Sequence, residues 1–225
     1  MLGQALEIDG PAGPLSGELL RPEAAKALLV LAHGAGAGYQ HANLQAIAGA
    51  LFEAEIATLR FNFPFMQAGR RRVDSPKVAT AALAAALATG SDRCPELPLF
   101  LGGHSFGGRM ASHAVLEHSL VPRGLVFCSF PLHQPKKPGV ARAAHLQDIE
   151  LPMLFLSGTR DALAQRELLE EVLARLDRRA QLHWLATADH SYRILKRQRE
   201  PQPTVFEEMA GVIAEFVATV LESGS

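Results

Sequence analysis

The chain has 225 residues, of which 48% are hydrophobic and 20% charged, and its 22 basic and 23 acidic residues leave a formal net charge of −1. This composition excludes an intrinsically disordered chain, because such chains combine few apolar residues with a high net charge. The balanced charge argues against a dedicated nucleic-acid binder, whose domains carry a basic excess. The length fits one domain over residues 1–225, since single α/β domains of roughly 200–250 residues are common.

Cysteine content and apolar runs bear on the compartment. Cys94 and Cys128 are too few for a disulfide framework and form no Cys-x-x-Cys pair, so we expect neither a zinc ribbon nor a redox pair. Residues 1–7 lack the basic and apolar segments of a signal peptide. No stretch approaches the roughly 20 apolar residues of a membrane span. We therefore expect a cytoplasmic protein with no membrane span.

Strands and helices alternate along the chain. An antiparallel hairpin is predicted first, from 6–8 and 15–20, at one edge of a sheet. Short apolar runs then predict strands buried on both faces, and runs with helical spacing predict helices between them. The expected strands are 27–32, 56–61, 98–102, 124–130, 151–157 and 181–185, and the expected helices are 42–53, 76–90, 105–117, 162–176 and 205–221. This order predicts an α/β fold with a mostly parallel, doubly wound sheet.

Two of the predicted helices carry start or stop signals. Ser75 is a candidate N-cap before Pro76 at the first helical position, and Gly90 is expected to close that helix. Thr204 and Glu207 have the spacing of a capping box at the start of the last helix.

A Gly-x-Ser-x-Gly motif, from Gly103 to Gly107, follows the predicted strand 98–102 and opens a predicted helix. A serine hydroxyl is a weak nucleophile, so it must be held exposed on a tight turn, near a base and near amide donors. The two glycines remove side chains that would collide with neighbouring elements. We predict that Ser105 is a nucleophile. The alternative is a glycine-rich turn or phosphate cradle that holds no nucleophile.

A serine nucleophile needs a base and an acid that orients the base, and in this architecture the acid precedes the histidine in the chain. Asp161 lies just after the strand 151–157, and His190 lies just after the strand 181–185. Functional groups gather at the carboxyl ends of parallel strands. We predict Asp161 as the acid and His190 as the general base. Asp161 also suits a helix N-cap. Asp189 is a rival acid, but it adjoins the base and cannot easily reach its ring.

An oxyanion hole needs two N–H donors. The amide of Phe106, directly after the nucleophile, is the first candidate. The second is the amide of Ala35, in a loop of small residues that begins His33-Gly34 and lets the backbone approach a substrate. This loop lacks the Gly-Lys-Ser/Thr ending of a phosphate loop, and its glycines are too closely spaced for a dinucleotide fingerprint.

The loops after two further strands supply candidate pocket residues. Large side chains follow the strand 56–61 and overhang the same edge, where they line an acyl or aromatic pocket or else belong to the core. His133 lies in a proline-restrained loop that we expect to form one wall of the site. Arg70–Arg72 either attract an anionic substrate or form a solvated charged loop. The candidate substrate-binding residues are Gly34, Asn62, Phe63, Phe65, Met66 and His133.

Together these motifs resemble the α/β-hydrolase superfamily over nearly the whole chain, and their order is similar to that of a small, dienelactone-hydrolase-related branch. The resemblance implies an α/β-hydrolase fold, a triad of Ser105, Asp161 and His190, and no cofactor. Dienelactone hydrolases use a cysteine nucleophile where this chain has Ser105, so lactone specificity does not carry over. The motifs that carry the resemblance are His33–Gly36, Arg60–Pro64, Gly102–Ser112, Phe130–His133, Gly158–Asp161 and Asp189–His190.

The segment between 130 and 151, where lids are inserted in this superfamily, is short, so we expect a core with no lid domain and an exposed cleft. We predict a serine hydrolase that cleaves carboxylic esters or thioesters, with a small-molecule ester as its partner and no metal or nucleic acid. Two alternatives stay open. One is a non-catalytic binding or scaffold domain, a role that some relatives in this branch serve, and the other is a peptidase. The sequence leaves the oligomeric state open.

Overall fold

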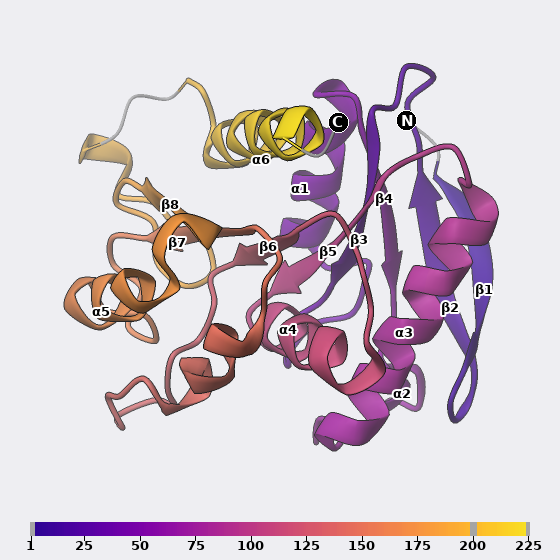
Figure 1. Cartoon of the computed structure of the whole chain (residues 1–225), viewed down its shortest axis with the longest axis horizontal. Coiled ribbons are helices and arrows are strands. Elements are labelled where there is room, and N and C mark those ends of the chain that lie inside the picture. The colour runs from indigo at the N-terminus through magenta and orange to yellow at the C-terminus, as the bar shows by residue number, and fades with distance from the viewer. Residues whose placement is uncertain (1–2, 199–201, 224–225) are drawn as a thin grey trace.

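An eight-stranded sheet runs through the computed structural model, which describes residues 3–198 and 202–223 (Figure 1). The strand order is β1-β2-β4-β3-β5-β6-β7-β8, with β2 antiparallel to both β1 and β4 and every other neighbouring pair parallel. The strands are β1 (Gln4–Gly10), β2 (Gly13–Leu20), β3 (Ala27–Ala32), β4 (Ile56–Phe61), β5 (Leu99–His104), β6 (Leu125–Cys128), β7 (Met153–Gly158) and β8 (Ala180–Leu185). The predicted parallel sheet with an antiparallel edge hairpin is confirmed.

Helices cover both faces of this sheet (Figure 1). The helix α1 and the helix α6 pack on one face, and the helices α3, α4 and α5 pack on the other. Adjacent residues of β3 show why both faces are needed, because Leu28 belongs to one apolar core and Leu29 to the other. The helices are α1 (Ala42–Glu53), α2 (Pro64–Gln67), α3 (Pro76–Arg93), α4 (Phe106–His118), α5 (Arg166–Leu176) and α6 (Val205–Ser223), with short 3₁₀ helices η1 (Ala141–Asp148), η2 (Asp177–Arg179) and η3 (Lys196–Gln198).

Most element boundaries agree with the sequence, and the differences have local causes. The helix α3 continues past Gly90 to Arg93, because Gly90 is a close-packing position rather than a helix end: a Cβ there would lie 3.1 Å from Leu28 Cδ2. Ser75 makes no side-chain capping bond. The helix α5 begins at Arg166 instead of 162, because the chain after Asp161 first forms a turn.

The capping box before α6 is confirmed. Thr204 N donates to Glu207 Oε2 at 2.7 Å, and Glu207 N donates back to Thr204 Oγ1 at 3.3 Å.

The segment between β6 and β7 forms a loop and η1, which agrees with the expectation of no lid domain. The 3₁₀ helix η1 packs against α4 and α5, so the chain inserts no lid at this point. Met1 and Leu2, which belong to the segment expected to lack a signal peptide, lie outside the described residues. Within 3–198 and 202–223, no helix is long and apolar enough to cross a membrane.

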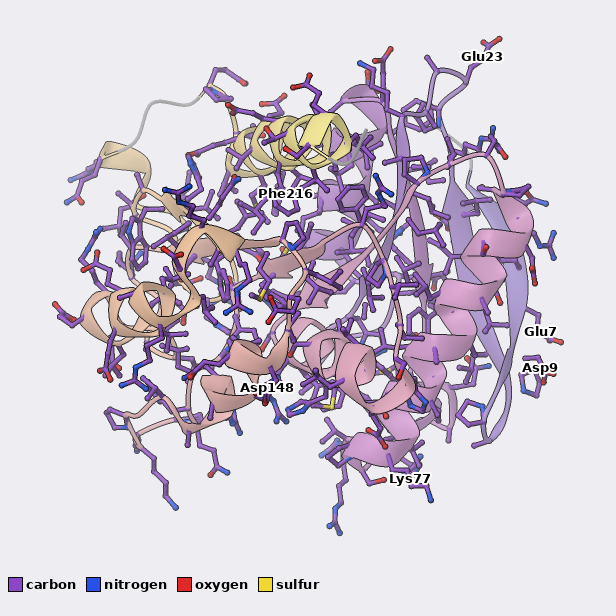
Figure 2. The ribbon with its side chains drawn as sticks, viewed as in Figure 1. Glu7, Asp9, Glu23, Lys77, Asp148 and Phe216 are labelled. Carbon is purple, nitrogen blue, oxygen red and sulfur yellow. The ribbon has the colours of Figure 1, made fainter. Side chains whose placement is uncertain are left out.

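The packing of α6 on the sheet gives a test of the core. Phe216, which is 2% exposed, lies between α6 and β5, with its ring centroid 6.1 Å from that of Phe100 (Figure 2). Phe216→Ala is expected to lower the free energy of unfolding by about 3–5 kcal/mol, because it removes buried apolar surface and leaves a cavity. Denaturant unfolding measures the change. Leu116→Ala, at a side chain that is 39% exposed, is the control and should change it by about 0.5 kcal/mol or less.

Candidate active site

The predicted nucleophile stands on a sharp turn between β5 and α4. Ser105 has φ 51° and ψ −110°, a conformation that non-glycine residues seldom adopt. Its backbone is held on both sides: Ser105 N donates to the Cys128 carbonyl at 2.9 Å, and Arg109 N donates to the Ser105 carbonyl at 3.1 Å. Strained backbone of this kind persists only where the surrounding structure enforces it. The turn presents the hydroxyl group at the carboxyl edge of the sheet.

The glycines of the motif allow this turn to pack against the end of β3. A Cβ on Gly107 would lie 2.6 Å from the Ala32 carbonyl oxygen and 2.7 Å from that of His33. A Cβ on Gly103 would lie 2.4 Å from the Ala32 oxygen. All three distances are shorter than real Cβ contacts, so larger residues at these positions would force α4 and β5 away from β3.

The three residues of the predicted triad lie in one chain of hydrogen bonds. His190 Nε2 is 2.8 Å from Ser105 Oγ, and His190 Nδ1 is 2.8 Å from Asp161 Oδ2. The second carboxylate oxygen of Asp161 accepts from Leu163 N at 2.8 Å, and the residue is buried. An imidazole protonated at Nδ1 donates to Asp161 and leaves Nε2 free to accept the serine proton.

The rival acid has a different set of contacts. Asp189 Oδ1 accepts from Ser191 N at 2.9 Å and from Arg193 N at 3.0 Å. Its carboxylate therefore stabilises the loop that carries His190 rather than the imidazole itself.

A second histidine supports the loop of the predicted base. His104 Nε2 donates to the His190 carbonyl at 3.0 Å, which ties the end of β5 to the loop after β8. Burial lowers the pKa of His104 to about 4, so this imidazole is neutral at pH 7. This role of His104 was not predicted from the sequence, although its place inside the motif, next to Ser105, was a usable signal.

The loop after β3 carries the second predicted oxyanion donor, and a buried histidine fixes it. His33 Nδ1 donates to the Gly34 carbonyl at 2.8 Å, and its Nε2 accepts from Phe63 N at 3.0 Å. Burial lowers the pKa of His33 to about 4, which keeps the ring in the neutral form that both bonds require. The amides of Ala35 and Phe106 donate to no acceptor within the described residues. Both are thus available to a substrate oxygen.

A cavity of about 260 Å³ opens beside Ser105 and His190. Its lining comes from the loop after β3, the start of α1, the turn at Ser105 and the loop after β8. Gly34 and Ala35 are among the lining residues, as predicted, and His41 and Leu44 were not foreseen. Across the described residues, no group of three metal-ligating side chains is placed to hold an ion.

The aromatic residues after β4 correct the predicted pocket. Phe63 and Phe65 are fully buried, and their rings pack on His33 and Phe106 at centroid distances of 4.9–6.0 Å. The helix α2 turns the chain back at once, so these rings enter the core beneath the site rather than its surface. They do not line the cavity.

The other three predicted pocket residues hold loops in place. Asn62 Oδ1 accepts from Tyr39 N at 3.1 Å, and Met66 is partly buried against the core. His133 is buried, with its Nε2 2.9 Å from Gln165 Oε1. None of Asn62, Met66 and His133 lines the cavity.

Residues 25–218 match the family model described as an alpha/beta hydrolase domain. A dienelactone hydrolase from Anabaena variabilis superposes with a TM-score of 0.77 at 19% identity, covering 97% of each chain. A serine hydrolase without a lid from Xanthomonas campestris gives 0.70 at 20% identity, over 98% of this chain and 94% of that one. An esterase domain from Rhodothermus marinus gives 0.72 at 16% identity, over 97% and 99%. At these identities, the likeness shows the fold alone.

The contact between the turn and β3 can be tested with a pair of helical glycines. Gly107→Ala is expected to lower the free energy of unfolding by about 1–3 kcal/mol, because its Cβ would overlap the backbone of β3. Gly211→Ala in α6, where a Cβ would meet nothing within 4 Å, should raise it by about 0.5–1 kcal/mol. Denaturant unfolding of both variants is the measurement. Equal effects of the two substitutions would contradict the packing argument.

Proposed function

The chain belongs to the alpha/beta hydrolase domain family, and we propose that it is a serine hydrolase that cleaves carboxylic esters or thioesters. The observation that carries this proposal is the continuous chain of hydrogen bonds from Ser105 Oγ through His190 to Asp161, with both contacts to the imidazole at 2.8 Å. A buried acid, an oriented imidazole and a hydroxyl on a strained turn are the parts that acyl transfer needs.

In the first half of the proposed reaction, His190 Nε2 takes the proton of Ser105 as its Oγ attacks the acyl carbon. Asp161 stabilises the imidazolium that forms. The amides of Phe106 and Ala35 stabilise the oxyanion of the tetrahedral intermediate. When the intermediate collapses, the carbon–oxygen or carbon–sulfur bond to the leaving group breaks, and His190 gives that group its proton. An alcohol or thiol leaves, and the acyl group stays on Ser105.

Water completes the second half. His190 takes a proton from the water, whose oxygen attacks the acyl carbon, and the oxyanion again meets the two amides. The bond to Ser105 then breaks, the proton returns from His190 to Ser105 Oγ, and the carboxylic acid leaves. The amino end of α4 adds a positive dipole at the position where negative charge develops.

The cavity bears on the size of the substrate. Its volume of about 260 Å³ is below the range of about 300–1,000 Å³ typical of drug-sized ligand sites. Ala35 and Gly36 on its rim are exposed and small. These features favour a small acyl group in the cavity, with the remainder of a longer substrate extending over the surface.

Removing the hydroxyl tests the nucleophile. The purified protein is expected to react with a fluorophosphonate probe and to hydrolyse 4-nitrophenyl acetate, and Ser105→Ala should lose both reactions because the attacking oxygen is gone. Gel fluorescence and the release of 4-nitrophenolate are the measurements. Ser91→Ala, at an exposed serine in α3, is the matched control and should keep both.

Labelling that persists in Ser105→Ala would contradict the assignment of the nucleophile. A wild-type protein that is neither labelled nor active on esters and thioesters would contradict the whole proposal, and would favour a binding domain that keeps a hydrolase fold.

Exchanging one carboxylate for an amide tests the acid. Asp161→Asn should lower kcat by about 10⁴-fold, because an amide N–H facing Nδ1 selects the tautomer whose Nε2 cannot accept the serine proton. Asp189→Asn keeps an oxygen for the Ser191 and Arg193 amides, so its kcat should stay near that of the wild type. Ester hydrolysis rates decide between the two carboxylates. A larger loss in Asp189→Asn would make Asp189 the acid.

A further inference from the structure

A cluster of basic side chains lies outside the site described above, where η1 packs against α4. It consists of Arg109 and His113 from α4 and Arg142 and His145 from η1, and we name it the arginine–histidine cluster. The two imidazoles stack, with ring centroids 3.7 Å apart and planes 15° apart. In Figure 1 the turns of η1 lie beside α4, against which η1 packs.

The arginines of this cluster have no acidic partner. Both side chains are half-buried, and across the described residues no carboxylate lies within ion-pair distance of Arg109 or Arg142. Arg142 Nη1 donates to the His133 carbonyl at 3.0 Å. Glu117 is the acidic group whose charge acts on His113, and its carboxylate accepts from Thr80 Oγ1 at 2.8 Å.

The positive charges of this cluster repel one another. Burial lowers the pKa of Arg109, and the charge of Arg142 lowers it further. Burial, then His113 and Arg109, lower the pKa of His145 to about 4. Placing like charges together in a partly desolvated position is unfavourable unless an opposite charge joins them.

The position of the cluster relates it to the nucleophile. Arg109 lies one helical turn after Ser105, and its amide is bonded to the Ser105 carbonyl. Long side chains on a helix lean toward its amino end, which here is the end that carries Ser105. Arg142 is anchored to the loop after β6, whose His133 is in turn bonded to Gln165 just before α5. The backbone of Arg109 and the carbonyl that anchors Arg142 therefore both lie in segments that follow strands at the carboxyl edge of the sheet.

From these observations, we propose that Arg109 and Arg142 bind an oxyanion, a carboxylate or a phosphate, that the substrate carries in addition to its scissile ester. This proposal rests on the proposed function. A planar guanidinium donates two parallel hydrogen bonds to either group, and two guanidiniums on different elements can hold one oxyanion between them. The substrate class is then an anionic ester.

The histidines of the cluster keep it ordered. His145 Nε2 is 2.8 Å from Ser112 Oγ, and that hydroxyl donates to the Arg109 carbonyl at 2.8 Å. Ser112 is fully buried and its proton is engaged, so this second serine–histidine contact is a structural one. It sets the orientation of His145 and, through the stacked pair, of His113.

A matched set of aryl acetates tests the proposal. The set is 4-acetoxybenzoate, its neutral methyl ester, and 4-acetoxyphenyl phosphate, which all transfer the same acetyl group. The ratio of kcat/KM for an anionic ester to that for the neutral ester should fall about tenfold or more in Arg109→Met and in Arg142→Met, because charge-assisted hydrogen bonds are lost. Arg123→Met, which removes an exposed charge before β6 at the opposite edge of the sheet, should leave the ratio unchanged.

The two anionic esters distinguish a carboxylate site from a phosphate site. The site prefers the anion whose kcat/KM ratio falls more strongly in Arg109→Met and Arg142→Met. If the ratio of kcat/KM values is the same in the wild type, Arg109→Met and Arg142→Met, the proposal is overturned. Equal loss in Arg123→Met would also overturn it, because the effect would then come from net charge.

A binding measurement separates this proposal from the proposed function. In the Ser105→Ala variant, 4-acetoxybenzoate or inorganic phosphate should shift the imidazole proton resonances of His113 and His145, and the added substitution Arg109→Met should abolish the shift. Absent or undiminished shifts would overturn the anion site whether or not the protein hydrolyses esters. If these resonance shifts occur but the wild-type protein is not labelled by a fluorophosphonate, only the proposed reaction is contradicted.

Discussion

The site depends on the close contact between the turn after β5 and the carboxyl end of β3. A Cβ on Gly107 would lie closer to the carbonyl oxygens of Ala32 and His33 than a side chain tolerates. This contact places the amino end of α4 directly beside the loop that begins at Gly34. The amides of Phe106 and Ala35 therefore lie on the two sides of one junction. The positive φ of Ser105 follows from the same contact, so the packing of β3 and α4 offsets the strain in its backbone.

Two neutral histidines extend this constraint to the surrounding loops. A neutral imidazole has one donor and one acceptor, and His33 uses both to join the loop after β3 to the loop after β4. His104 joins the turn to the loop that carries His190. Burial holds the pKa of each ring at about 4, so neither adds a positive charge next to the imidazolium that the proposed reaction forms on His190. The loops are thus linked without raising the electrostatic cost of that step.

The sequence pointed to the three residues of the proposed triad because three separate signals fell at strand ends. Ser105, Asp161 and His190 each follow a short apolar run, and short apolar runs identify buried strands well. The 2.8 Å contacts between them depend on the strand order from β5 to β8, which those signals do not contain. The support from His104 was missed for a similar reason, since its partner is the carbonyl of a residue from another loop.

The pocket could not be predicted because apolar residues after a strand suit a pocket and a core equally well. The deciding feature is α2, four residues long, which directs Phe63 and Phe65 beneath the site. Its backbone is held by Asp74, whose Oδ2 accepts from Phe65 N at 2.8 Å while Oδ1 accepts from Arg70. Arg70 is thus committed to this turn, and the choice between substrate attraction and a solvated charged loop stays a prediction for Arg71 and Arg72. Within the described residues, Arg109 on α4 and Arg142 on η1 differ from Arg70 because they are half-buried and meet no carboxylate.

The buried and half-buried arginines support that distinction, because Arg60 and Arg179 pair with Glu18 and Glu150. Exposed arginines are less informative because solvent screens their charges: Arg70, Arg166 and Arg175 each meet a carboxylate, and others such as Arg71 and Arg123 meet none within the described residues. The half-buried Arg109 and Arg142 have none, although the lower dielectric there makes a partner more valuable. A net charge of −1 conceals this contrast, because it arises from placement and not from number. In the proposed scheme, the reacting groups lie on loops after β5, β7 and β8, and the charge that selects a substrate lies on α4 and η1. Substrate preference can then change through α4 and η1 while the geometry of Ser105 and His190 stays intact.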